Sequence, residues 1–265
     1  MPQLREDWRN DALLRHFMQH VVPIYFDLRK GDDRHHVIFT AFLFSVDGNW
    51  LLMTAGHCIT KMKEWREHGY QIAACRLIDS LGVNARFRHP VPFDYDGAEP
   101  TMLGIHHTWD YGVLFPAYNT CQLLEANGIT AFTERSWEPL VEQAEIYRLL
   151  GIPSELTVAT ANDWLNVTML FPRVERLDER PEGFEETNAP MFYGRLPTNP
   201  LTSLLGMSGG PILALAHVDG QARYWLHAMQ VSSLGDYISG MLMRPIGKYM
   251  QAICAGEHGD AARAP

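Results

Sequence analysis

The spacing of apolar residues changes at about residue 21. Within residues 1–20, apolar side chains recur among charged ones at helical spacing, which predicts a short amphipathic N-terminal helix. From residue 21 onward the apolar runs are short and are separated by turn-forming residues, a pattern typical of β-strands. Residues 37–46 and 50–56 flank an Asp-Gly-Asn turn and predict a β-hairpin. Many such strands over more than 200 residues favour a β-barrel or sandwich.

Composition and charge narrow the classes of function. Apolar residues make up 46% of the 265 residues and charged residues 20%, so the chain can bury a core and is not disordered. The formal net charge of −9 gives no electrostatic reason to expect nucleic acid or an anionic membrane as a partner. The longest apolar run, residues 37–46, is far shorter than the roughly 20 residues that a membrane helix needs.

Cysteine usage and the N-terminal residues bear on the compartment. The four cysteines show no CxxC spacing, so we expect no structural zinc. Residues 11–26 are interrupted by Arg15, His16 and His20 and do not form the apolar stretch of an export signal. We therefore expect a cytoplasmic protein, with secretion as the alternative if the N-terminus has been processed.

Three segments carry residues suited to nucleophilic catalysis. They are Thr54-Ala55-Gly56-His57-Cys58, Trp109-Asp110-Tyr111-Gly112-Val113-Leu114 and Gly206-Met207-Ser208-Gly209-Gly210-Pro211. A serine hydroxyl is a weak nucleophile until a neighbouring base takes its proton, and histidine has a suitable pKa at neutral pH. A carboxylate can hold the second imidazole nitrogen and so orient the ring.

In this order, the three segments resemble the boxes of chymotrypsin-like (trypsin-fold) serine proteases. TAGHC is similar to the family's TAAHC, GMSGGP to its GDSGGP, and WDYGVL to its weaker DIALL box. The resemblance implies that His57 is the general base and then acid, that Asp110 orients and stabilises it, and that Ser208 attacks the substrate carbonyl. It also implies an oxyanion hole formed by the backbone amides of Gly206 and Ser208.

The same resemblance suggests how substrate binds and how activity is controlled. Thr202 stands where the family has the floor of its S1 pocket, although it could equally be a turn residue; without an acid there, we expect an uncharged residue at P1. Gln230, Val231 and Ser232 resemble the strand that pairs with an extended substrate. Met207 replaces the acid that pairs with a newly freed amino terminus in secreted relatives, so we expect no activation by N-terminal trimming.

Two further features depart from a simple reading of the family pattern. Cys58 follows the histidine as in secreted relatives, but the preceding strand offers no cysteine to pair with it, so we expect a buried free thiol. On a strand end it would point away from His57, which makes it a poor rival nucleophile. Residues 172–190 are rich in charge and are expected to be a solvated loop, with an active-site border or a partner-docking loop as the alternatives.

The predicted fold is all-β, with two antiparallel six-stranded β-barrels of the chymotrypsin-like kind and short terminal helices. We expect residues 1–20 to be a helical extension, 21–135 the first barrel, 136–255 the second barrel with a C-terminal helix, and 256–265 a flexible tail. The predicted function is a serine endopeptidase acting on protein or peptide substrates, without metal or organic cofactor. A regulatory protein partner, a non-cleaving binding module and a non-proteolytic acyl hydrolase remain alternatives.

Overall fold

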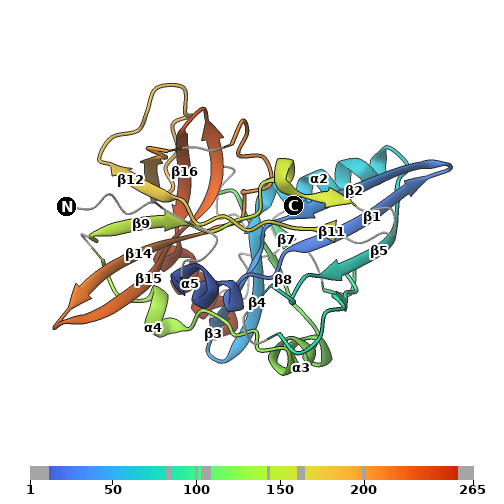
Figure 1. The fold of residues 1–265 in the computed structure, drawn as a ribbon, viewed down its shortest axis with the longest axis horizontal. Coiled ribbons are helices and arrows are strands. Elements are labelled where there is room, and N and C mark those ends of the chain that lie inside the picture. The colour runs from blue at the N-terminus through green and yellow to red at the C-terminus, as the bar shows by residue number, and fades with distance from the viewer. Residues whose placement is uncertain are drawn as a thin grey trace.

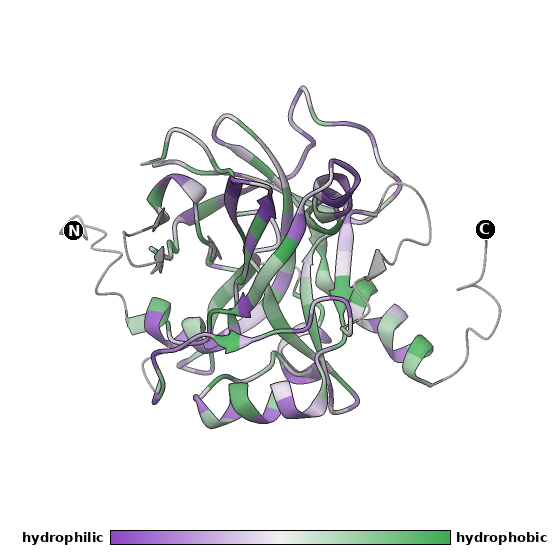
Figure 2. Cartoon of the chain, turned by 90° about the vertical axis from the view of Figure 1, so that its right-hand side faces the viewer, coloured by the Kyte–Doolittle hydropathy of each residue, from purple (hydrophilic) through white to green (hydrophobic). Residues whose placement is uncertain are grey.

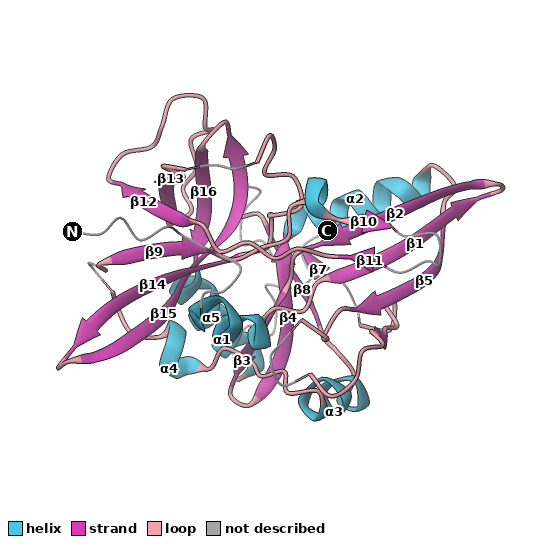
Figure 3. Cartoon of the chain, viewed as in Figure 1, coloured by secondary structure: helices cyan, strands magenta, loops and turns pink. Residues whose placement is uncertain are grey.

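The chain folds into two β-rich halves joined by a shared core. The computed structural model describes residues 12–81, 85–98, 101–102, 109–141, 144–159, 165–198 and 201–255. In Figure 1 the strands of the second half lie on the left, and three strands of the first half, β1 (Ile24–Lys30), β2 (Asp33–Phe39) and β5 (Gln71–Leu77), lie on the right. Figure 3 shows strands and short helices in both halves. The predicted all-β class is confirmed.

The second half closes into a six-stranded antiparallel barrel, as predicted. The order around the barrel is β12-β13-β16-β15-β14-β9. These strands are β9 (Ile146–Leu149), β12 (Arg173–Leu177), β13 (Met191–Arg195), β14 (Pro211–Val218), β15 (Gln221–Leu234) and β16 (Tyr237–Leu242). A separate pair is formed by β10 (Val158–Ala159) and β11 (Leu165–Asn166). The charged segment 172–190 was expected to be a loop. Residues 173–177 of it form β12, so the loop extends only over residues 178–190, which corrects the prediction.

The first half differs from the predicted closed barrel. Its described strands form two four-stranded antiparallel sheets, in the orders β2-β1-β5-β6 and β3-β4-β8-β7. The strands are β1 (Ile24–Lys30), β2 (Asp33–Phe39), β3 (Phe42–Val46), β4 (Asn49–Ala55), β5 (Gln71–Leu77), β6 (Val91–Pro92), β7 (Thr101–Met102) and β8 (Tyr111–Leu114).

A break inside one apolar run explains the two sheets. Residues 37–46 read as one strand in the sequence, but Thr40 and Ala41 belong to neither β2 nor β3. The carbonyl of Ala41 accepts from Val22 N at 2.8 Å, and that of Thr40 accepts from Thr54 Oγ1 at 2.9 Å. Backbone groups engaged in this way cannot continue a strand ladder, so the chain passes from one sheet to the other at this point.

The predicted hairpin is confirmed as β3 and β4. Its turn residues Asp47 and Gly48 have φ of 49° and 79°, the left-handed pair that a two-residue hairpin turn requires.

Short helices flank the sheets. They are α1 (Ala12–Phe17), η1 (Met18–His20), α2 (Gly56–Glu67), α3 (Tyr118–Ala126), α4 (Glu134–Trp137), η2 (Ser154–Leu156) and α5 (Met243–Cys254). Both predicted terminal helices are present, whereas residues 1–11 and 256–265, including the predicted flexible tail, lie outside the described residues. Within the described part of the chain, no helix has the length and apolar character needed to cross a membrane.

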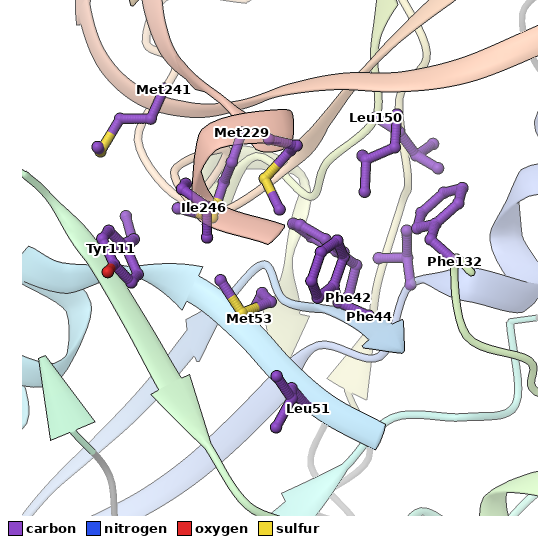
Figure 4. Packing of buried hydrophobic residues seen from close by; sticks show 14 of the residues in the cluster. Phe42, Phe44, Leu51, Met53, Tyr111, Phe132, Leu150, Met229, Met241 and Ile246 are labelled. Carbon is purple, nitrogen blue, oxygen red and sulfur yellow. The ribbon is translucent and has the colours of Figure 1, made fainter. Parts of the chain in front are cut away.

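A hydrophobic core bridges the two halves and fixes their relative position. Figure 4 shows Phe42, Phe44 and Met53 of the first half packed near Met229 and Met241 of the barrel, all of them almost completely buried. Figure 2 shows hydrophobic residues in the central strands, while hydrophilic ones are frequent in the peripheral loops. Burial of aromatic and methionine side chains on this scale stabilises one arrangement of the two halves.

Candidate active site

His57 and Asp110 form a doubly hydrogen-bonded pair. His57 Nδ1 lies 2.7 Å from Asp110 Oδ2, and the backbone N–H of His57 donates to Asp110 Oδ1 at 2.7 Å. The carboxylate accepts from Nδ1, so Nδ1 carries a proton and Nε2 is left as the basic nitrogen. The His57 side chain is 49% exposed, so a reactant can reach the ring.

The environment of the imidazole favours its charged form. Partial burial of the ring opposes the charge, but the hydrogen bond that Nδ1 donates to Asp110 and the nearby Cys58 sulfur outweigh it, and the pKa of His57 rises to about 10. The ring is thus a stronger base than an ordinary histidine.

The pairing of β4 with β8 brings the two residues together. Ala55 pairs with Tyr111, so the residues just beyond these strand ends meet at the same edge. Helix α2 begins at Gly56, so His57 lies in its first turn instead of at a strand end, which corrects the position expected for both His57 and Cys58. Gly112 leaves room for α2, because a Cβ at that position would lie 2.3 Å from Ile59 Cδ1 and this side chain would have to shift.

The barrel also holds Asp110 in place. The backbone N–H of Asp110 donates to the Met241 sulfur of β16 at 3.1 Å. Met241 belongs to the core that bridges the halves, so the carboxylate is tied to the half that carries Ser208.

The Ser208 loop packs directly against the end of β4. Gly209 has φ of 87°, and a Cβ there would lie 2.3 Å from Thr40 O and 3.0 Å from Ala55 N. Only glycine permits both this conformation and this contact. Ser208, the residue before Gly209, is half-buried, and no hydrogen bond joins its hydroxyl to the imidazole of His57 among the described contacts. Such contacts are often long in the absence of substrate.

Two backbone amides of the loop are oriented as donors. Leu205 O accepts from Ser154 N at 2.8 Å, and Met207 O accepts from Gly210 N at 2.9 Å. Because N–H and C=O point in opposite directions in a trans peptide, the amides of Gly206 and Ser208 point away from these partners. Neither amide has an acceptor among the described residues. This arrangement can stabilise an oxyanion.

Met207 anchors the loop in the barrel interior. Its side chain is 0% exposed and lies in the barrel core, where its sulfur would be 3.0 Å from a Cβ at Gly151. No charge is involved in this anchor.

Thr202 is exposed, and its polar groups are occupied. Its backbone N donates to both carboxylate oxygens of Glu155 at 3.1 and 3.2 Å, and its hydroxyl also donates to Glu155. These hydrogen bonds, with one from Ser203, lower the pKa of Glu155. Glu155 is a residue that sequence reasoning missed, because nothing in the sequence links it to a loop 47 residues away.

The predicted substrate strand lies at a free strand edge. The pairing of β15 with β14 ends at Met229, so beyond Gln230 that edge of β15 faces no described strand. Gln230 is buried and fixes the Ser208 loop, accepting from Gly209 N and donating to Gly210 O. Val231 is also buried, whereas Ser232 is exposed. An exposed edge of this kind can accept an added strand.

The cysteines are all free, as expected for Cys58. Cys58 and Cys75 are buried, Cys121 is half-buried and Cys254 is exposed. No group of three or more metal-ligating side chains occurs among the residues that the structure describes.

Comparisons with known proteins identify the fold. No family model matches the chain, and no curated protein matches its sequence. The chain is similar in structure to the thermostable serine protease AL20 from an extremophilic microorganism, with a TM-score of 0.50, 12% identity, and coverage of 90% of this chain and 97% of that chain. It is also similar to the scabies mite inactivated protease paralogue SMIPP-S-I1, with a TM-score of 0.52, 12% identity, and coverage of 91% and 96%.

The chain therefore has the chymotrypsin-like serine protease fold, which confirms the fold implied by the three sequence boxes. At 12% identity the likeness extends to the fold alone. Because one of the two similar proteins is an inactivated paralogue, activity has to be argued from the site.

Proposed function

We propose that this protein is a serine endopeptidase that hydrolyses peptide bonds with His57, Asp110 and Ser208 as its catalytic residues. The observation that carries the proposal is the pair of 2.7 Å hydrogen bonds from His57 to Asp110, which leaves Nε2 as the base beside the Ser208 loop. The proposed oxyanion hole consists of the amides of Gly206 and Ser208.

The proposed reaction has two stages. In the first, Ser208 Oγ bonds to the carbonyl carbon while its proton passes to His57 Nε2, and the carbonyl electron pair moves to the oxygen held by the two amides. The tetrahedral intermediate collapses, the C–N bond breaks and the amine leaves with the proton from His57. In the second stage, water attacks the acyl-enzyme in the same way, releasing the carboxylic acid and restoring Ser208.

Substrate is proposed to bind along the free edge of β15. The backbone of Val231 and Ser232 would pair with an extended peptide, and the loop from Thr202 to Ser208 would form the P1 pocket. Glu155 supports this pocket by holding Thr202. The proposed reaction uses no cofactor. Four free thiols fit a reducing compartment such as the cytoplasm.

Activation is proposed to need no N-terminal cleavage. An ammonium group would have no acid to bind in the loop, because the side chain there is the buried thioether of Met207. Active protein whose intact mass matches the full chain is the expected result. Activity that appears only after a defined N-terminal cut would contradict this part of the proposal.

A fluorophosphonate probe and labelled casein test the function together. The wild type should be labelled at Ser208 and should cleave casein, whereas Ser208→Ala should do neither and should keep the wild-type melting temperature. Ser136→Ala is the matched control, since it removes a serine hydroxyl that donates to Thr133 O, outside the proposed site. Absence of labelling would indicate the non-cleaving module, and labelling with ester turnover but no peptide cleavage would indicate an acyl hydrolase.

A further inference from the structure

Thr40 occupies a junction between the two halves. Its side chain is 0% exposed. Thr40 lies between β2 and β3, far in sequence from the segments that contain Asp110 and Ser208. The Thr40 hydroxyl donates to Gly206 O at 2.6 Å and accepts from Ile152 N at 3.0 Å. A single hydroxyl therefore satisfies two backbone groups of the barrel.

The contact with Gly206 fixes the peptide that follows one oxyanion donor. Ser154 N fixes the preceding peptide by donating to Leu205 O at 2.8 Å. Gly206 lies between these two fixed peptide planes with φ of 90°. Glycine has few steric limits on its backbone angles, so without these hydrogen bonds the peptides on either side of it could rotate. With both planes held, the direction of the Gly206 N–H is determined.

The backbone of Thr40 extends the connection toward the histidine. Thr40 O accepts from Thr54 Oγ1 at 2.9 Å, and Thr54 is three residues before His57 in the same segment. The same carbonyl would lie 2.3 Å from a Cβ at Gly209, on the other side of Ser208. Thr40 thus contacts the nucleophile loop on both sides of Ser208 and the strand that leads to the base.

We propose that Thr40 is a positioning residue that sets the oxyanion loop in its active arrangement and holds it in register with His57. This inference rests on the proposed function. In this role the neutral hydroxyl of Thr40, which belongs to the first half, orders the loop. An ion pair cannot do so, because the side chain at position 207 is an uncharged thioether. Deleting the hydroxyl leaves Gly206 O and Ile152 N without a partner, so the peptide between Gly206 and Met207 is held only at its N–H, which donates to Leu204 O at 3.0 Å.

Kinetics of Thr40→Val, which replaces the hydroxyl by a methyl group of similar size, test the proposal. The burst of p-nitrophenyl acetate, corrected with Ser208→Ala, should show an acylation rate constant about 10- to 100-fold lower, with little change in the apparent KM. This is below the loss of about 10²–10³ from deleting an oxyanion donor outright. Thr40→Ser keeps the hydroxyl and should restore most of the rate. Ser136→Ala, which deletes another buried hydrogen-bonded hydroxyl at Thr133 O, should leave the rate unchanged.

Hydrogen–deuterium exchange provides a readout that does not depend on catalysis. In Thr40→Val, peptides covering residues 201–210 should exchange faster than in the wild type, because Met207 N and Gly210 N lose protection with the loop. Ser136→Ala should leave them unchanged. If Thr40→Val does not fold, Thr40→Ala deletes the same hydroxyl and is measured in its place.

The outcomes separate the two proposals. Unchanged acylation and unchanged loop exchange in a folded Thr40 variant would overturn the role of Thr40 while leaving the protease assignment intact. Faster loop exchange in a protein whose wild type shows no burst and no fluorophosphonate labelling would support Thr40 as a loop anchor and reject the protease.

Discussion

Replacing Asp110 by Asn should place the proton of His57 on the wrong nitrogen. Both oxygens of Asp110 accept from His57 at 2.7 Å, one from the backbone N–H and the other from Nδ1. An amide offers one oxygen and one NH₂ group. The backbone N–H can only donate, so the amide oxygen must face it and the NH₂ group must face Nδ1. Two donors cannot share a 2.7 Å contact, and the proton therefore moves from Nδ1 to Nε2, the nitrogen that is proposed to accept the proton of Ser208.

The expected loss is larger than that from a weakened hydrogen bond. Losing a hydrogen bond to a charged group costs about 1.5–3 kcal/mol, which corresponds to about 10- to 150-fold in rate. Reversing the tautomer removes the base function itself, for which a loss of about 10⁴-fold, or about 5.5 kcal/mol, is expected. The two explanations can therefore be separated by the size of the effect.

Fluorophosphonate labelling rates of Asp110→Asn between pH 6 and pH 10 provide the assay. The acid limb of the wild-type profile should lie above pH 6.5, because Asp110 and Cys58 raise the pKa of His57 to about 10, and it should move to lower pH in the variant. Asp96→Asn, which alters an exposed pair with Arg66, is the control and should keep the wild-type rate. The comparison is made at pH 10, where a large share of His57 is neutral in both proteins, and labelling of Asp110→Asn within tenfold of the wild type at that pH would refute the assignment of the tautomer.

Three further predictions concern stability, specificity and the thiols. Burial lowers the pKa of His20 from 6.5 to about 4. As the pH falls, the unfolded chain therefore binds a proton at His20 before the folded protein does. About 3 kcal/mol of unfolding free energy, fully present above pH 6.5, should be lost as the pH falls to about 4. Urea unfolding at each pH measures this slope, which should shrink in His20→Gln. A peptide library should show cleavage after small or medium uncharged residues, since Thr202, Leu204 and Leu205 carry no charge and the Glu155 carboxylate is already engaged by the backbone N–H and hydroxyl of Thr202. Selective cleavage after Arg or Lys would contradict this. Iodoacetamide should modify exposed Cys254 well before Cys75, whose burial raises its pKa to about 12, as mass spectrometry of the native protein can check; equal rates would indicate that the fold opens readily.

The sequence predicted the site residues that lie within a few positions of a recognisable box. His57, Asp110 and Ser208 were predicted because their segments resemble the boxes of a known family, and a glycine that the local geometry favours lies within two residues of each. Gly112 admits Ile59, and Gly209 admits Thr40 O, so these positions leave a visible trace in the sequence. The hairpin at Asp47 and Gly48 was predictable for the same reason.

Other features depend on contacts between distant segments and leave no such trace. Thr40 meets Gly206 across 166 residues, and a buried threonine in an apolar run resembles any strand residue. The division of the first half into two sheets depends on the hydrogen bond between Val22 and Ala41, which the apolar pattern of residues 37–46 conceals. The start of α2 at Gly56 was missed because TAGHC continues an apolar strand without a capping side chain.

The oxyanion loop is held by uncharged groups, which suits a proposed base whose pKa is raised. A loop ordered by a free amino terminus would lose its anchor above about pH 8, where the ammonium group deprotonates. Here Met207 is buried, Thr40 donates through a hydroxyl and Ser154 through its amide, and none of these groups titrates in that range. With the pKa of His57 raised to about 10, the fraction of neutral imidazole increases into alkaline solution. The loop can therefore keep its donors in place over the pH range in which His57 becomes free to accept the proton of Ser208.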